Sequence, residues 1–338
     1  MKKISLILLC LVLMSSLTFA AAKKAVKKSA APAPILTAPE AALQSPVITI
    51  VNKATINGSF RVRYMASESG AVMDAFSLSR ARIKLTGEIT PDILFLVQPD
   101  FAGLSTGGTV SMADAHVQIK TPLTLLKAGQ FLLPFGYDSA KYKTIFSAGF
   151  NPTYYGLIVN SRDYGVRVSG AFPFLSDFSY DGALVNGTNG ADVNKSKDIV
   201  GRANYKNNFL NIGLSGYYGF AGAASLQKRD AGIDLEYKND PCQVVAEYML
   251  GGNLAAAAKL SDAYVQLSAM IENHEPLIKY EAYDPDMNVG ANAVNMLTLG
   301  YGYYVDKTTK LLVNYNLINE ETTQINNNSL LIELQTQI

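Results

Sequence analysis

From residue 53 to the end of the chain, apolar and polar side chains alternate at every second position in about sixteen short segments. In one of them Ala81, Ile83 and Leu85 fall on one side, while Arg82 and Lys84 fall on the other. Successive side chains of a β-strand point to opposite faces, so a period of two residues indicates strands and not helices. The pattern therefore predicts an all-β fold.

The links between these segments alternate between short and long. The short links carry turn residues such as proline, asparagine and aspartate. Barrels of the bacterial outer membrane have an even number of strands, with short turns at the periplasmic rim and longer loops at the other rim. The pattern thus predicts a transmembrane antiparallel β-barrel of about sixteen strands over residues 53–338. Short links are expected at 90–92, 121–122, 206–208, 239–241, 273–276 and 306–308, and longer ones near 66–73, 102–110, 187–196, 220–228, 251–260, 285–293 and 319–328.

The composition agrees with a membrane barrel. Hydrophobic residues make up 49% of the chain and charged residues 17%, yet no helix-length stretch after the N-terminal segment is uniformly apolar. A chain that crosses a membrane without apolar helices must satisfy its backbone hydrogen bonds as a closed barrel. Tryptophan is absent, so we expect the 19 tyrosines and 14 phenylalanines to form the interfacial girdles.

The N-terminus predicts export. Residues 1–22 combine a positive start, an apolar stretch and small residues at the end, which is the pattern of a cleaved signal peptide. Residues 23–52 are rich in Ala, Lys and Pro and cannot bury a core, so they are expected to be a periplasmic linker. A flexible spacer is the favoured reading of this linker, and a tether to an anionic envelope polymer is the alternative. The predicted location is the outer membrane of a Gram-negative cell.

Charge placement suggests how the barrel interior is lined. Residues 1–52 hold six lysines and one acidic residue, which leaves 23 basic and 27 acidic residues for the barrel. Bulk charge therefore gives no argument for nucleic acid as a partner. Strand parity turns several basic residues inward, where they would line the lumen and guide anions, although mixed charge is ordinary for any wet lumen. The residues predicted to do so are Arg61, Arg63, Arg80, Arg82, Lys84, Arg167 and Arg202.

The longest link runs from about Gly136 to Ser161 and is the third loop on the extracellular rim, counted from a periplasmic start. Loops of this length are usually functional or disordered. This loop is dense in Phe and Tyr and also carries Lys141 and Lys143. We expect it to fold into the lumen, narrow it and form a constriction.

Three segments of the barrel region are distinctive: Phe76 to Gly87 with its Arg-x-Arg strand, Gly129-Gln130-Phe131 to Pro134-Phe135-Gly136, and Tyr280 to Asp286. Together they resemble the phosphate-selective porin O and P family. The resemblance implies a sixteen-stranded, usually trimeric porin with an inward third loop, in which arginines and lysines guide small inorganic anions or other small solutes. It also implies outer-membrane lipid around a homotrimer. Outer-membrane barrels commonly end in an aromatic residue, whereas the last residue here is Ile338.

Two other classes of function fit the sequence less well. An outer-membrane hydrolase needs a nucleophile and a base, but the two histidines, His116 and His274, stand in no recognisable motif, and no paired metal-ligand spacing occurs. No enzyme activity, cofactor or metal is therefore predicted. A non-conducting structural or adhesive barrel would need a plug, because sixteen strands enclose an aqueous channel. The sequence does not set the preferred solute, the pore radius or gating.

Overall fold

The structure is a computed structural model that describes residues 53–68, 74–137, 162–172, 174–188, 192, 194–221, 225–253 and 258–338. The chain divides into two units, 1–48 and 49–338, and the described residues belong to the second. The predicted signal peptide (1–22) and the whole of the predicted linker (23–52) lie outside the described residues.

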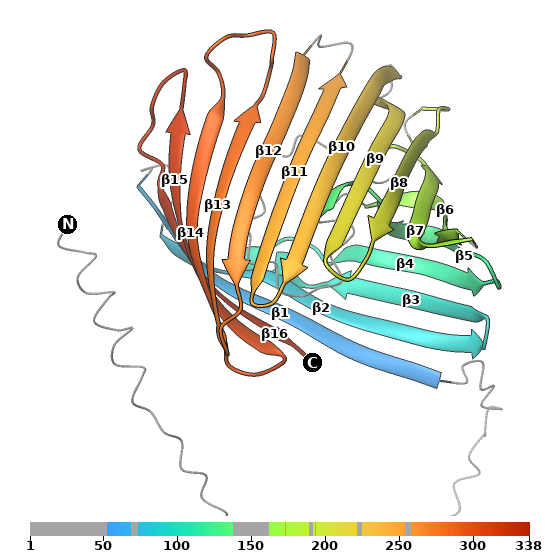
Figure 1. Ribbon diagram of the computed structural model, residues 1–338. Coiled ribbons are helices and arrows are strands. Elements are labelled where there is room, and N and C mark those ends of the chain that lie inside the picture. The colour runs from blue at the N-terminus through green and yellow to red at the C-terminus, as the bar shows by residue number, and fades with distance from the viewer. Residues whose placement is uncertain are drawn as a thin grey trace, which may run out of the picture. The chain divides into compact units, whose positions relative to one another are not determined.

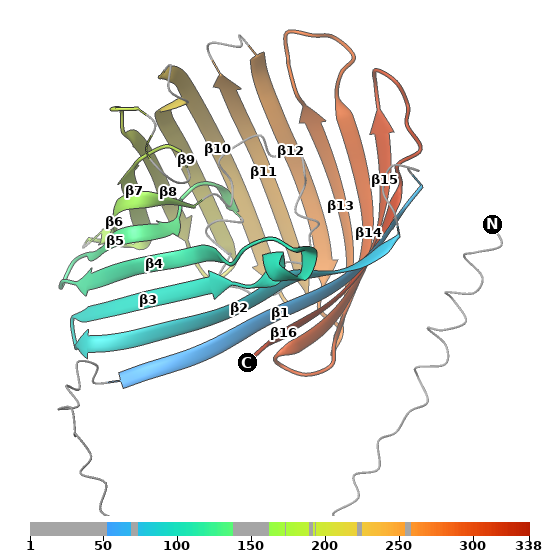
Figure 2. The ribbon, with the colours of Figure 1, turned by 180° about the vertical axis from the view of Figure 1, so that it is seen from behind.

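The described residues form sixteen strands (Figures 1 and 2), as the alternating pattern predicts. A 3₁₀-helix, η2, spans Ala102–Thr106 between two of them. The strands are β1 (Lys53–Ser67), β2 (Ala75–Thr90), β3 (Ile93–Asp100), β4 (Ser111–Lys120), β5 (Leu125–Leu132), β6 (Arg162–Phe172), β7 (Leu175–Val185), β8 (Asp198–Lys206), β9 (Leu210–Ala221), β10 (Leu226–Asn239), β11 (Cys242–Asn253), β12 (Ala258–Ala269), β13 (His274–Asp284), β14 (Val294–Tyr304), β15 (Thr309–Glu320) and β16 (Ser329–Gln337).

The sheet closes on itself, so the barrel has no edge strand. Each strand pairs antiparallel with its sequence neighbours, and β1 pairs with β16, where Ser59 lies opposite Gln337. Gly58 and Ile338 complete this seam through two backbone hydrogen bonds of 2.8 and 2.9 Å. Closure satisfies the backbone groups that an open edge would leave exposed to lipid.

The two faces of the wall differ as the period of two requires. Val62 and Ile83 point outward and are 47% and 43% exposed. Arg80, which has the opposite parity to Ile83 on the same strand, points inward and is buried. An apolar outer face suits lipid, and a polar inner face suits water. No helix in the described part of the chain is long and apolar enough to cross a membrane.

Two predicted loops are shorter than expected. The links near 220–228 and 251–260 shrink because β9 and β10 pair as far as Ala221 and Leu226, and β11 and β12 pair as far as Asn253 and Ala258. Gly- and Ala-rich ends look like loops in sequence. Here the neighbouring strand supplies hydrogen-bond partners that extend the ladder.

The predicted turn at 273–276 is also misplaced. His274 is the first residue of β13, and Pro276 lies inside that strand opposite Tyr301. The turn itself lies at Glu272 and Asn273, and Glu272 has a φ of 54°. Proline is tolerated near the start of a strand where its nitrogen is not needed as a donor, so it does not mark the turn here.

Candidate functional site

Strand parity places the predicted basic residues on the inner wall. Arg80, Arg82 and Lys84 on β2 all line one cavity inside the barrel, and so do Arg167 on β6 and Arg202 on β8. Ile83, between two of them, faces the other way and is exposed on the outside. β2 pairs with β1, and in this register Arg82 lies opposite Ser59.

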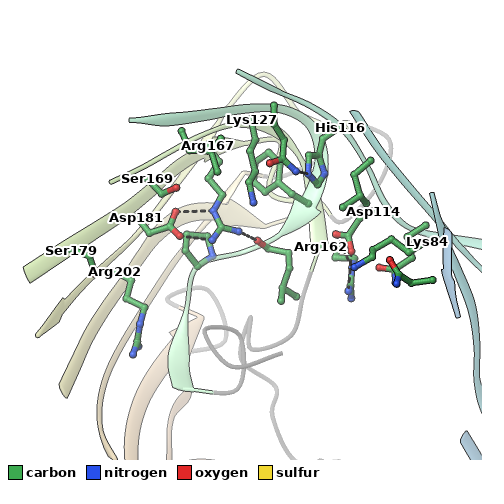
Figure 3. Close-up of a pocket in the computed structure, with 18 of the residues that line it drawn as sticks. Lys84, Asp114, His116, Lys127, Arg162, Arg167, Ser169, Ser179, Asp181 and Arg202 are labelled. Atoms are coloured by element: carbon green, nitrogen blue, oxygen red, sulfur yellow. Dashed lines mark hydrogen bonds and ion pairs between the residues drawn. The ribbon is translucent and has the colours of Figure 1, made fainter. Parts of the chain in front are cut away.

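The cavity has a volume of about 790 Å³ and is lined by residues of β1–β9 and β16 (Figure 3). Its titratable lining is strongly asymmetric. Two acidic side chains, Asp114 and Asp181, face a larger basic group together with His116. The basic side chains are Arg80, Arg82, Lys84, Lys127, Arg162, Arg167, Arg202 and Lys206.

Four of the cavity arginines form ion pairs with carboxylates. Figure 3 shows the guanidinium of Arg167 turned toward Asp181, which it contacts through two nitrogens. Such pairing lowers the positive charge that a passing anion meets. The other pairs are Arg82 Nε with Asp100 Oδ2 at 2.6 Å, Arg162 Nε with Asp114 Oδ1 at 3.3 Å, and Arg202 with Asp234, where Nη2 lies 2.8 Å from Oδ1.

Lys84 and Lys206 differ from these arginines, because neither forms an ion pair with a residue in the described part of the chain. Both lie toward the periplasmic ends of their strands, where Lys84 is opposite Asn57 and Lys206 is opposite Asn211. A compact ammonium on a flexible stem remains able to contact a solute.

The position of Arg202 depends on a glycine. Its guanidinium crosses β9 at Gly213, where an added Cβ would lie 2.0 Å from Nη2. Nη1 donates to Ser215 Oγ at 3.1 Å and Nη2 to Asn204 Oδ1 at 3.1 Å. These contacts hold the guanidinium against the inner wall.

Two of the seven predicted residues, Arg61 and Arg63 on β1, are not among the residues that line this cavity. Arg63 Nη2 lies 2.9 Å from Glu333 Oε2, and Ser79 donates to the same carboxylate at 2.7 Å. A β-bulge between Arg61 and Val62 shifts the β1–β2 register at this height. Arg63 on β1 and Arg82 on β2 therefore have carboxylate partners on different strands, which parity alone could not show.

Sequence reasoning did not single out Lys127, Arg162 and Lys206. Lys127 alternates with the apolar Leu126 and Ala128, so the same parity rule identifies it as inward. Arg162 begins β6 directly after the longest link, and Lys206 ends β8 at a turn. Parity is unreliable at such strand ends because pleating stops there.

The start of the third loop lies inside the barrel. After β5 the chain turns inward, and the amide of Gly136 donates to Ser215 Oγ at 3.1 Å while the amide of Tyr137 donates to Glu247 Oε1 at 2.8 Å. Phe135 is fully buried against the inner faces of β10 and β11, near Gly232 and in one apolar cluster with Met249.

The rest of that loop, residues 138–161, lies outside the described residues, and so do Lys141 and Lys143. A constriction made by this loop therefore stays a prediction. Among the described residues, no group of three or more His, Cys, Asp and Glu side chains could hold a metal ion.

A closed sixteen-stranded antiparallel barrel with an apolar outer face and a charged, hollow interior defines a channel-type β-barrel of the outer membrane. The family model described as Gram-negative porin matches residues 29–323, and the chain belongs to that family. No curated protein matches the sequence.

Solved structures with the same fold are distant in sequence. Salmonella typhi OmpF, in a complex with daunomycin, is 14% identical with a TM-score of 0.66, and the match spans 85% of this chain and 98% of that chain. The anion-selective porin from Comamonas acidovorans is 14% identical with a TM-score of 0.64, covering 85% and 99%. The trimer form of OmpT from Vibrio cholerae is 10% identical with a TM-score of 0.63, covering 85% and 99%. At these identities the likeness shows the fold.

Proposed function

We propose that this porin is a passive diffusion channel for small hydrophilic solutes and ions, with a modest preference for anions. The observation that carries the proposal is the lining of the cavity, in which eight basic side chains face two acidic ones. A channel is proposed in preference to an enzyme, because no sequence motif marks out a nucleophile with its base.

The expected preference is modest for an electrostatic reason. A unit charge about 4 Å from an ion contributes roughly 1 kcal/mol in open water and up to about 4 kcal/mol near partly desolvated protein. Most cavity arginines share their charge with a carboxylate, which cancels much of their field at a distance. The lysines without such partners, Lys84 and Lys206, are the strongest candidates for direct contact with an anion.

Phosphate as a preferred anion rests on the resemblance to phosphate-selective porins, carried by the Phe76–Gly87 and Gly129–Gly136 segments. A homotrimer in the outer membrane, reached through a cleaved signal peptide, is proposed on the family and on the N-terminal pattern. The trimer form of the Vibrio cholerae relative is consistent with that assembly.

The test is the zero-current potential of the natural protein in a planar bilayer under a potassium chloride gradient. The sign should show anion preference, and it should move toward zero in a variant with Lys84→Ala and Lys206→Ala. Lys307→Ala, in an exposed turn, is the matched control and should leave the potential unchanged. A cation-preferring natural pore would defeat the anion proposal and leave the channel proposal standing.

A second variant tests the arginines of β1 and β2, with Arg61, Arg63, Arg80 and Arg82 changed to Ala. Because Arg63 and Arg82 are paired with Glu333 and Asp100, the loss of anion preference per charge removed should be smaller than for the two lysines. A larger loss per charge would mean that the ion pairs do not hold those arginines.

A further inference from the structure

Residues 132–137 lead from the end of β5 into the barrel, and we call this segment the loop entry. The amide of Phe135 donates to the carbonyl oxygen of Leu133 at 3.0 Å, and Gly136 has a φ of 75°, so the chain turns tightly here. A backbone that leaves a sheet loses the neighbouring strand as its hydrogen-bond partner, and its buried amides and carbonyls must be satisfied elsewhere. The partners of these groups therefore show what holds the loop entry in place.

Arg167 on β6 supplies one of these partners. Its Nη1 donates to the carbonyl oxygen of Leu132 at 2.6 Å, at the residue where β5 ends. Its Nε and Nη2 both donate to Asp181 on β7, with Nε 2.7 Å from Oδ1 (Figure 3). A planar guanidinium with donors on three nitrogens can hold a carboxylate and a carbonyl at once, whereas an ammonium is a single point of charge on a flexible stem. Arg167 thus connects the loop entry to β7.

The hydroxyl of Ser215 on β9 supplies a second partner. Its oxygen accepts from the amide of Gly136 at 3.1 Å and from Nη1 of Arg202 at 3.1 Å. A hydroxyl oxygen has two acceptor lone pairs, so both donors can be satisfied together. Because Arg202 also forms a buried ion pair with Asp234, Ser215 joins the loop entry to a fixed point of the wall.

Apolar side chains of the loop entry are buried against the same wall. Leu133 and Phe135 are 2% and 0% exposed, and both belong to one cluster with Val185 and Val200. Apolar contacts are non-directional, whereas hydrogen bonds depend on the angle between donor and acceptor. Burial therefore keeps the loop entry inside the barrel, and the polar contacts set its direction.

We propose that Arg167 and Ser215 are positioning residues that set the direction in which the third loop enters the lumen, with Arg202 holding the Ser215 hydroxyl in place. The inference rests on the proposed channel function only for its effect on conductance. The sequence predicts that both arginines guide anions. However, Arg167 directs three, and Arg202 four, of the five guanidinium N–H bonds to protein acceptors. Their main effect on a solute therefore comes through the loop entry and not through direct contact.

Cysteine labelling of the detergent-solubilised full-length protein tests the position of the loop entry. In a Cys242→Ser background, Leu133→Cys is the reporter, because this side chain is buried while the segment is seated. Arg167→Lys keeps the positive charge without the fork of donors, and Ser215→Ala removes the shared hydroxyl without changing any charge. Each should raise the labelling rate of the reporter by a water-soluble thiol reagent about ten-fold, because an unsatisfied buried group makes local opening easier.

Three controls separate positioning from a general loss of stability. Ser215→Thr restores a hydroxyl and should label at the natural rate. Ser179→Ala removes a cavity hydroxyl that forms no hydrogen bond with the described residues 132–137, and it should also label at the natural rate. Leu277→Cys is a second reporter, buried on β13 beside Gly300, and it should stay unreactive in both test variants because the wall there remains closed.

Unchanged labelling of the Leu133→Cys reporter in Arg167→Lys and Ser215→Ala would overturn the proposal, and so would an equal rise at Leu277→Cys. Single-channel conductance in a planar bilayer is the second readout. The two variants should change it in the same direction, since neither alters the cavity charge. A change in Arg167→Lys alone would overturn the proposal and assign Arg167 to direct contact with the solute. A natural protein that passes no ions would defeat the channel proposal, while the labelling would still decide the positioning role.

Discussion

Arg202 on β8 reaches across β9 to form an ion pair with Asp234 on β10, and both side chains are almost completely buried. The two residues are not on adjacent strands. The pair exists because Gly213, directly opposite Asp234, leaves the space that the guanidinium occupies. The arrangement fixes one cavity cation to the wall and couples pore charge to barrel stability.

Replacing Asp234 by Asn should therefore change both properties. Removing one partner of a buried ion pair leaves an uncompensated charge, so the free energy of unfolding should fall by about 3 to 5 kcal/mol. The remaining Arg202 charge should shift the zero-current potential toward stronger anion preference. Asp92→Asn, in an exposed turn, is the control for both measurements. A stable variant with an unchanged potential would show that the pair contributes to neither.

Cysteine labelling tests the orientation of β2. In a Cys242→Ser background, Arg82→Cys should react with a water-soluble thiol reagent through the pore, because the side chain faces the cavity. Ile83→Cys should be shielded by lipid, since that position faces outward. Equal labelling of the two positions would contradict the register or the barrel itself.

Phe135 anchors the start of the third loop inside the barrel. Truncation to Ala removes a fully buried ring beside Met249 and Gly232, so this segment should loosen from the inner wall. We expect larger or noisier single-channel conductance in the variant. Phe174→Ala, where the ring is 97% exposed, should conduct as the natural protein does. Identical conductance in Phe135→Ala would show that this anchor does not shape the open pore.

Asp306 stabilises the turn between β14 and β15 through its carboxylate. The amide of Thr308 donates to it at 2.6 Å and the amide of Thr309 at 2.8 Å, and these bonds hold the pKa of Asp306 below its ordinary value. A lowered pKa in the folded state means that the stabilisation is complete above the ordinary carboxyl pKa and is lost as the pH falls through the lowered value.

Asp306→Ala should therefore lower the urea midpoint of unfolding at pH 7, and this deficit should shrink as the pH falls through the lowered pKa of the natural carboxyl group, which then becomes protonated. Lys307→Ala, in the same turn, should show no such pH dependence. A deficit in Asp306→Ala that does not change with pH would mean that the carboxylate charge does not support the turn.

The sequence alone determined the barrel and which side chains face its interior. The period of two that separates Arg82 from Ile83 follows from strand pleating, which is local, and it holds wherever a strand continues. Closure of the sheet follows from the need to satisfy every backbone group in lipid, and the apolar outer face follows from the cost of placing charged side chains against lipid. The same reasoning was wrong at 220–228 and 251–260, because the end of a strand depends on what its neighbour can pair with.

Only the tertiary structure decided which inward charges act together. Arg202 on β8 pairs with Asp234 on β10, and Arg63 on β1 pairs with Glu333 on β16. Neither pairing can be inferred from how far apart the residues lie in the sequence. Parity is set residue by residue, whereas register is set by closure of the whole barrel, and register places these charges beside one another.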